Sequence, residues 1–312
     1  MRSQKFDVII IGGGAAGMAA AVWCDELGLK ALLLESNTEL GGQLLWTYNA
    51  IKNYLGVEAE NGRELRDVFL KQTNEREFSL KKKSEVVDIN LENKTVWLKN
   101  GENFVARALV IATGVSRRKL GITGEDDFQG RGIIESGKRD MQLIEGKRVC
   151  IVGGGDAALE NALILAETAS QVTLIHRQTD FRARLDFIEQ VSKCQKIQIL
   201  TEMVVTKIIG NERLEALELK NLKTDEANIL PIDALLVRIG IEPNTKLLSG
   251  KLELDDNAFI KIDSNCETSV KNVFAVGDVA NPISPTINSA VGMGTTAVKV
   301  IRQRLTASNP NN

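Results

Sequence analysis

A glycine motif that occurs twice with the same spacing most constrains the fold of this chain of 312 residues. The first copy, Gly12–Gly17, follows an apolar run and is followed in turn by Glu35. The second copy, Gly153–Ala158, also follows an apolar run and precedes His176 and Arg177. In both copies the polar residue stands 23 positions after the first glycine, which is the spacing of a strand, a tight turn, a helix and a second strand. Two dinucleotide-binding units are therefore predicted.

The residue at the end of each second strand indicates which dinucleotide the unit prefers. The first glycines of such a motif permit a tight turn and a close approach of a pyrophosphate, which the helix N-terminus then attracts. Glu35 can accept hydrogen bonds from both ribose hydroxyls, which suits FAD or NAD. His176 and Arg177 would instead attract a 2′-phosphate. The sequence therefore predicts FAD in the first unit and NADPH, or alternatively NADH, in the second.

Composition argues against several other classes of protein. With 43% hydrophobic residues, the chain can bury the core of about two domains. Lys and Arg total 39 against 41 Asp and Glu, so the net charge of −2 gives no overall attraction to nucleic acid. The uncharged stretch 8–24 is short for a membrane span, and three consecutive glycines would weaken a helix there. We expect no nucleic-acid partner, no membrane association and a cytoplasmic protein.

The four cysteines are scattered and form neither a Cys-x-x-Cys motif nor a zinc-like spacing. Cys24 is expected in the helix after the first glycine turn, and Cys150 in the strand before the second. Both are expected to be small buried hydrophobic residues. Unpaired thiols are usual in a reducing compartment, although a disulfide is the alternative.

Further apolar runs predict the remaining elements. Strands are expected at residues 85–89, 95–98, 108–114, 234–240 and 273–279, with a helix at 288–305. Asp278, just beyond the last strand, is placed to hydrogen-bond the ribityl chain of a flavin, and a helix cap is its alternative role.

The order of these motifs resembles the low-molecular-weight thioredoxin reductases and their relatives over nearly the whole chain. The other matching strings are Gly41–Leu44, Lys52–Gly56, Gly130–Gly132, Phe181–Ala183 and Pro243–Thr245. The resemblance implies an α/β fold of two Rossmann-like, three-layer (ββα) dinucleotide-binding domains, the second inserted in the first. An FAD-binding domain would comprise residues 1–116 and 245–312, and an NAD(P)H-binding domain residues 117–244. A homodimer whose two domains rotate relative to each other is implied as well.

Candidate cofactor contacts follow from the two motifs and from this resemblance. For FAD they are Gly12, Gly14, Ala15, Ala16, Glu35, Gly42, Gln43, Leu44, Thr47, Asn53, Val87, Ala112, Thr113, Gly114, Gly277, Asp278, Thr286 and Ile287. For NADPH they are Gly153, Gly155, Asp156, Ala157, His176, Arg177, Arg182, Ile239 and Gly240. No metal site is expected.

One departure from the family concerns its redox-active cysteines. Where the family carries Cys-Ala-Thr-Cys-Asp, this chain has Ser136-Gly137-Lys138-Arg139-Asp140, so that Ser136 and Arg139 replace both cysteines. Thiol–disulfide exchange requires an attacking thiolate, and a hydroxyl forms no reducible bond. The sequence therefore predicts no catalysis by thiol chemistry.

Two smaller departures lie at the cofactor sites. Pro285–Thr286 replaces an Arg-Gln pair beside the flavin, where the backbone amide of Ile287 could still reach the flavin ring. Gln178 replaces an arginine in the second unit, which leaves Arg177 and Arg182 to hold a 2′-phosphate. NADPH remains favoured over NADH.

These observations predict an FAD-dependent oxidoreductase that exchanges hydride with NADPH and passes electrons to an external acceptor, ferredoxin or flavodoxin. Lys138, Arg139 and the segment Arg117–Lys119 could receive such an acidic carrier, and a solvated basic face is the alternative. Two other functions compete with this one: an NAD(P)H oxidase or small-molecule reductase, and a regulatory protein that binds FAD or another nucleotide.

Overall fold

The chain divides into two compact units in the computed structural model, which describes residues 4–307. Unit 1 is assigned Met1–Ser116 and Glu242–Asn312, and unit 2 Arg117–Ile241; residues 1–3 and 308–312 lie outside the described part. The chain passes between the units twice, and these two connecting segments pair with each other as the short strands β7 (Val115–Arg117) and β16 (Ile241–Pro243). The second crossing therefore comes at 241/242, three residues before the predicted 244/245, because β16 already leads the chain out of unit 2.

The sheet of unit 1 is mainly parallel. Its strands lie in the order β3 (Ser79–Lys81), β2 (Ala31–Leu34), β1 (Gln4–Ile11), β6 (Asn103–Ile111), β5 (Thr95–Leu98) and β4 (Val86–Asn90). The carboxyl half of β6 pairs in parallel with β17 (Val273–Ala275), while its amino half pairs antiparallel with β5. The predicted strand at 108–114 is thus the second half of a longer one, because residues 103–107 also join the ladder.

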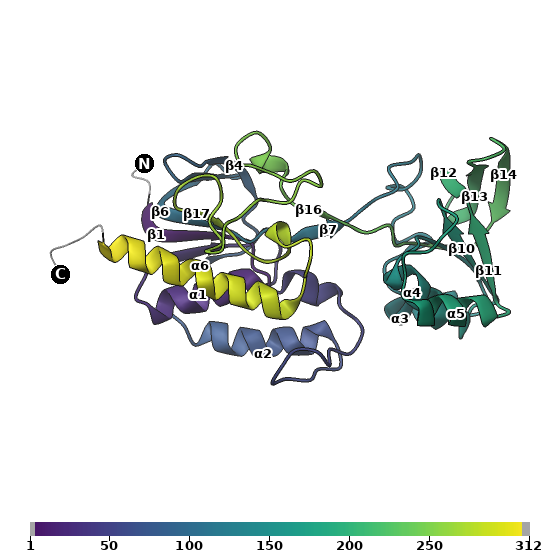
Figure 1. Ribbon diagram of the computed structural model, residues 1–312, viewed down its shortest axis with the longest axis horizontal. Coiled ribbons are helices and arrows are strands. Elements are labelled where there is room, and N and C mark those ends of the chain that lie inside the picture. The colour runs from purple at the N-terminus through teal and green to yellow at the C-terminus, as the bar shows by residue number, and fades with distance from the viewer. Residues whose placement is uncertain (1–3, 308–312) are drawn as a thin grey trace. The chain divides into compact units, whose positions relative to one another are not determined.

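Unit 1 has three layers, because the side chains of β1 alternate between two cores. Val8 and Ile10 belong to an apolar core that also contains residues of the helices α1 (Ala15–Glu26), α2 (Gly62–Asn74) and α6 (Ile287–Ala307). Figure 1 shows these three helices on one side of the sheet. Ile9 and Ile11 face a second apolar core that includes residues of β4, β5 and 248–280. The 3₁₀ helices of this unit are η1 (Gly42–Trp46), η3 (Lys246–Leu248) and η4 (Gly277–Ala280).

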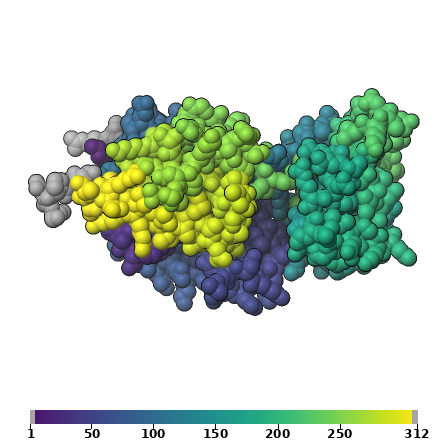
Figure 2. All heavy atoms as spheres, in the orientation of Figure 1, coloured from purple at the N-terminus to yellow at the C-terminus, as the bar shows by residue number. Residues whose placement is uncertain are grey.

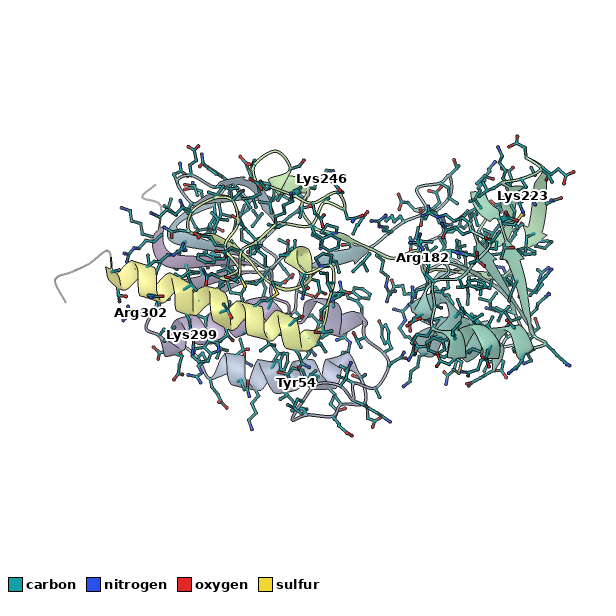
Figure 3. All side chains as sticks on the ribbon, viewed as in Figure 1. Tyr54, Arg182, Lys223, Lys246, Lys299 and Arg302 are labelled. Carbon is teal, nitrogen blue, oxygen red and sulfur yellow. The ribbon has the colours of Figure 1, made fainter. Side chains whose placement is uncertain are left out.

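Helix α6 packs closely on α1. A Cβ atom at Gly294 would lie 2.5 Å from the Ala16 carbonyl oxygen, so only glycine permits this approach. Lys299, labelled in Figure 3, lies over the Trp23 ring of α1, 4.4 Å from its centroid. The opposite side of α6 is exposed, and its yellow atoms form part of the surface in Figure 2. The packing of α6 on α1 thus holds the amino end of α1, and with it the first glycine turn, against the sheet.

Unit 2 repeats the layered plan. Its parallel sheet has the order β11 (Ile197–Thr201), β10 (Gln171–His176), β9 (Arg148–Val152), β15 (Ala234–Val237) and β8 (Ile133–Ile134). Its helical elements are α3 (Gly137–Asp140), η2 (Met141–Ile144), α4 (Asp156–Ala166) and α5 (Leu185–Lys193). An antiparallel sheet forms the remaining layer, with β12 (Met203–Gly210), β13 (Leu214–Asn221) and β14 (Ala227–Pro231).

Alternate residues of β9 again serve two cores. Val149 and Ile151 belong to the core that includes α4, and Cys150 and Val152 to the core that includes the antiparallel sheet. The predicted α/β fold of two Rossmann-like units, the second inserted in the first, is confirmed. Within residues 4–307, none of the helices is long and apolar enough to cross a membrane.

Candidate cofactor sites

Close backbone contacts at the first glycine turn leave no room for side chains. Gly12 has φ +109°, and a Cβ atom there would lie 2.3 Å from the Ala112 carbonyl oxygen. A Cβ atom at Gly42 would lie 2.9 Å from the Cα atom of Gly14, so these two backbones meet directly. Gly14 is the N-cap of α1 and has no side chain to occupy the first N–H groups of the helix. The turn therefore presents bare backbone and a helix N-terminus, which suits a pyrophosphate.

Glu35 is fixed on this turn at the end of β2. Its carboxylate is buried, and Oε2 accepts the Gly13 N–H at 2.8 Å. Oε1 accepts the backbone N–H and the side-chain amide of Asn37 at 2.8 and 2.9 Å. A carboxylate oxygen can accept about two hydrogen bonds, so Oε2 retains capacity for a ribose hydroxyl.

Asp278 lies in η4, immediately after β17. Its side chain is half-buried, and this burial raises the pKa of the carboxyl group above its ordinary value. No hydrogen bond to this carboxylate occurs within residues 4–307. A half-buried carboxyl group without a partner is suited to a ligand that carries hydroxyl groups, as the ribityl chain of a flavin does.

The amino end of α6 is capped by two hydroxyls. Thr286 Oγ1 accepts the Ser289 N–H, and Ser289 Oγ accepts the Thr286 N–H, each at 3.3 Å. The hydroxyl of Thr286 is thus engaged in a cap, a role that sequence reasoning missed. Ile287 is the first residue of the helix, so its N–H has no acceptor within the helix. The Asn288 side chain donates to the Asn53 carbonyl at 3.1 Å and brings that loop to the same helix end.

Other predicted FAD contacts serve to hold the surrounding loops. Gln43 Nε2 donates to the Val115 carbonyl at 2.7 Å, and Thr47 Oγ1 donates to the Gln43 carbonyl at 3.0 Å. Thr113 Oγ1 donates to the Asn244 carbonyl at 3.0 Å. The remaining predicted contacts are Ala15 and Ala16 at the start of α1, Leu44 in η1, Ala112 and Gly114 after β6, and Gly277 at the start of η4.

Val87 is the predicted contact farthest along the sheet from the glycine turn. It lies on the edge strand β4 and is 41% exposed. Ser84, three residues earlier, donates its N–H to the Glu35 carbonyl at 2.8 Å. The start of this segment therefore adjoins the end of β2, although Val87 itself is not part of the glycine turn.

The second glycine turn has the same backbone requirement. Gly153 has φ +156°, and a Cβ atom there would lie 2.2 Å from the Arg238 carbonyl oxygen. Gly155 is the N-cap of α4, and Asp156 and Ala157 are its first residues. In this structure the Asp156 carboxylate accepts the Arg184 N–H at 2.8 Å and lies 3.2 Å from the Arg184 guanidinium, in an exposed ion pair.

His176 is packed beneath this turn and does not face solvent. It is 8% exposed, and a Cβ atom at Gly154 would lie 2.1 Å from its Cε1 atom. The ring stacks on Phe181 with 5.2 Å between centroids, and Nε2 donates to the Asp180 carbonyl at 3.1 Å. Burial lowers the pKa of His176, and the positive charges of Arg177 and Arg182 act in the same direction.

The imidazole is therefore neutral at pH 7, and the charge expected to attract a 2′-phosphate comes from Arg177 and Arg182, not from His176. Both arginines are exposed. The backbone N–H of Arg182, labelled in Figure 3, donates to the Gly154 carbonyl at 2.8 Å, so the loop after β10 folds back onto the turn. Ile239 and Gly240 follow β15, and Gly240 accepts the Arg118 N–H at 3.0 Å.

Residues 136–140 form a short helix held by ion pairs. Ser136 is its N-cap, and its Oγ accepts the Arg139 N–H at 3.4 Å. The Arg139 guanidinium binds Asp140 at 2.6 Å and Glu135 at 2.5 Å. Burial alone would raise the pKa of Asp140, but the hydrogen bonds from Arg139 and from the amides of Ser136 and Glu135 lower it below its ordinary value.

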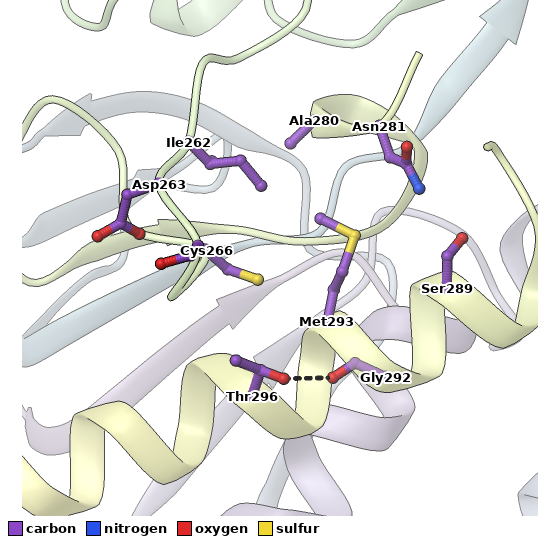
Figure 4. A pocket seen from close by; sticks show the side chains of 10 residues that line it. Ile262, Asp263, Cys266, Ala280, Asn281, Ser289, Gly292, Met293 and Thr296 are labelled. Carbon is purple, nitrogen blue, oxygen red and sulfur yellow. Dashed lines mark hydrogen bonds between the residues drawn. The ribbon is translucent and has the colours of Figure 1, made fainter. Parts of the chain in front are cut away.

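The four cysteines are unpaired and lie outside residues 136–140. Burial raises the pKa of the Cys24 thiol to about 12 and that of Cys150 further. Cys266 lines a cavity of about 450 Å³ beside α6, shown in Figure 4, and burial, with Asp263 nearby, raises its pKa to about 11. These three thiols are protonated at pH 7 and are poor nucleophiles.

Known proteins resemble this chain over nearly its whole length. The family model for pyridine nucleotide-disulphide oxidoreductases matches residues 6–294. The thioredoxin reductase of Mycolicibacterium smegmatis is 36% identical over 296 residues, which are 93% of this chain and 94% of that protein. The thioredoxin reductase of Streptomyces coelicolor is 34% identical over 298 residues, 95% and 92% respectively. The solved thioredoxin reductase of Lactococcus lactis, in its FR conformation, superposes with a TM-score of 0.85 at 29% identity, covering 97% of this chain and 99% of that one.

Proposed function

The chain belongs to the pyridine nucleotide-disulphide oxidoreductases and is thioredoxin reductase-like, and on that premise we propose that it reduces an external electron acceptor without a dithiol of its own. In this proposal unit 1 holds FAD, unit 2 holds NADPH, and hydride passes between the nicotinamide and the flavin when both are bound. The electrons then leave to ferredoxin or flavodoxin. A homodimer, as the family resemblance implies, and a cytoplasmic location are part of the proposal.

The observation that carries this proposal is the ion-paired segment at residues 136–140. A dithiol there would need two sulfur atoms, and the side chains are a capping hydroxyl at Ser136 and a guanidinium at Arg139. The protonated thiols of Cys24, Cys150 and Cys266 offer no replacement, and Cys194 is a single unpaired thiol outside this segment. Electrons that reach the flavin must therefore pass directly to a separate molecule.

The residues of each unit fit the cofactor proposed for it. In unit 1, Glu35 on the turn and the unpartnered Asp278 suit the two hydroxyl-bearing parts of FAD. In unit 2, the bare turn at Gly153 suits a pyrophosphate, and the exposed Arg177 and Arg182 suit a 2′-phosphate. NADH would lack only the contacts of these two arginines.

The basic surface expected to receive an acidic carrier is smaller than the sequence suggests. Lys119 pairs with Asp126 at 2.6 Å, and Arg139 is held by two carboxylates. Lys138 remains exposed beside them and is the best-placed cation for a carrier. This support is electrostatic and predicts that reduction of the carrier slows as ionic strength rises.

A stopped-flow absorbance experiment tests the proposal. The yellow protein should bleach under anaerobic NADPH, more slowly with NADH, and regain colour on addition of ferredoxin or flavodoxin. Recovery only with oxygen or a quinone would make the protein an oxidase or small-molecule reductase instead. A flavin that neither nucleotide bleaches would leave a regulatory nucleotide-binding protein and refute the proposal.

A further inference from the structure

Two arginines of unit 2 meet at one backbone oxygen. Arg238 follows β15 and Glu135 follows β8, so both lie at the carboxyl edge of the parallel sheet. The Glu135 carbonyl accepts hydrogen bonds from Arg238 Nη2 and from Arg117 Nη1, the latter at 2.5 Å. Two guanidinium groups are thus brought together at a neutral acceptor.

Arg238 is not neutralised by a carboxylate of its own. The two nearest acids, Glu135 and Asp140, both bind Arg139, and Arg238 forms no ion pair within the described chain. Burial lowers the pKa of Arg238 to about 10, Arg117 acts in the same direction, and the two acids oppose them. Arg238 is therefore still charged at pH 7. Arg238 thus carries a positive charge in a half-buried position without an ion pair within residues 4–307, and a bound anion would compensate that charge.

The position of Arg117 and Arg238 relative to the sheet indicates which anion would bind between them. In the order β11-β10-β9-β15-β8, the strands β10 and β11 lie on one side of β9, and β15 and β8 lie on the other. The strand order therefore reverses direction at β9, and dinucleotides bind across a parallel sheet at such a switch point. Arg177 marks the adenosine side, at the end of β10. The other half of the ligand must extend over β15 and β8, and the Arg238 carbonyl already borders the glycine turn at Gly153.

We infer that Arg117 and Arg238 form an oxyanion site for the phosphate on the nicotinamide side of a pyridine dinucleotide. The inference rests on the proposed binding of NADPH in unit 2. The N-terminus of α4 would receive one phosphate of the pyrophosphate, and the two guanidinium groups the other. A planar guanidinium can donate two hydrogen bonds to one phosphate, which a lysine cannot do.

Equilibrium binding by the flavin-loaded protein tests this site. The ligands are NADPH, NADH and 2′,5′-ADP, which lacks the nicotinamide half. Arg238→Gln should weaken NADPH and NADH alike by about tenfold, the effect of losing one charge-assisted hydrogen bond, and leave 2′,5′-ADP unchanged. Arg238→Lys should recover part of the affinity. Arg213→Gln, an exposed arginine just before β13, is the matched control and should bind all three ligands normally.

Arg117→Gln gives the same test at an exposed position, where loss of the side chain spares the core. Unchanged NADPH and NADH affinity in both variants overturns the inference. An equal loss for 2′,5′-ADP also overturns it, because that ligand has no nicotinamide-side phosphate. If the wild-type protein binds none of the three, the proposed function fails in unit 2 and the inference fails with it.

Discussion

The two glycine turns use opposite chemistry to solve the same packing problem. In unit 1 the residue at the end of the second strand, Glu35, accepts the N–H of the middle glycine. In unit 2 the corresponding His176 packs its imidazole ring against the middle glycine and stacks on Phe181. The residue at this position therefore braces the turn in both units. It remains available to a ligand only in unit 1, and in unit 2 the charge has moved to the loop that carries Arg177 and Arg182.

The substitution Gly12→Ala should have the largest effect, because it disrupts the glycine turn of unit 1 and leaves that of unit 2 intact. The new Cβ atom would lie 2.3 Å from a carbonyl oxygen in a positive-φ conformation, so the turn must shift, at a cost of about 1–3 kcal/mol. We expect loss of FAD, measured as flavin absorbance per chain. Gly155→Ala meets nothing within 4 Å and should keep its flavin, and a colourless Gly155→Ala variant would contradict the separation of the two sites.

A second test removes the Glu35 carboxylate, which accepts the Gly13 N–H and so supports the glycine turn of unit 1. Glu35→Ala leaves the Gly13 N–H without its acceptor and removes the proposed contact with ribose, so FAD affinity should fall by about 10- to 100-fold. Titration of the apoprotein with FAD measures this. Affinity of unit 2 for 2′,5′-ADP is the internal control, and a comparable loss there would show that the variant is misfolded.

Unit 2 should respond differently, because His176 supports its glycine turn whereas Arg177 and Arg182 supply the positive charge. Arg177→Gln should weaken NADPH by about tenfold and leave NADH unchanged, since only NADPH carries the 2′-phosphate. His176→Gln should change the NADPH/NADH ratio less than Arg177→Gln does. The reverse ranking, measured by equilibrium binding, would return the phosphate contact to the histidine.

The smallest effect is a dependence on pH confined to unit 2. The folded pKa of His176 lies below its unfolded value of 6.5, so the unfolded chain takes up the proton first as pH falls. The stability due to a neutral His176 is complete above pH 6.5 and is lost as pH falls through the folded pKa. His176 is the only histidine in the chain, so its ring resonances in an NMR titration report this directly. A midpoint at or above 6.5 would contradict a buried neutral ring.

Sequence reasoning captured what local patterns determine. The doubled motif predicted both turns, because the spacing of its glycines is a local pattern, although the contacts that exclude a side chain at Gly12 and Gly153 are made to the distant carbonyls of Ala112 and Arg238. It missed what depends on packing between distant segments. The amino half of β6 was absent from the prediction because residues 103–107 become a strand only by pairing with β5 on one side and β1 on the other.

Side-chain partnerships at the sites were equally hidden in the sequence. The burial of His176 depends on Phe181 folding back over the ring. The meeting of Arg117 and Arg238 joins residues 121 positions apart through the Glu135 carbonyl. The one available signal was a cation at the end of the apolar strand 234–237, which gave no indication of its partner.

The central claim, that the flavin passes electrons on without a protein dithiol, is tested most directly by anaerobic titration with NADPH. One NADPH delivers two electrons, and a flavin without a dithiol beside it accepts two. The flavin absorbance should therefore be fully bleached at one NADPH per flavin, in the wild type and in a variant that lacks all four cysteines. An end point of two NADPH per flavin in the wild type, falling to one in the cysteine-free variant, would reveal a redox-active cysteine pair and contradict the account.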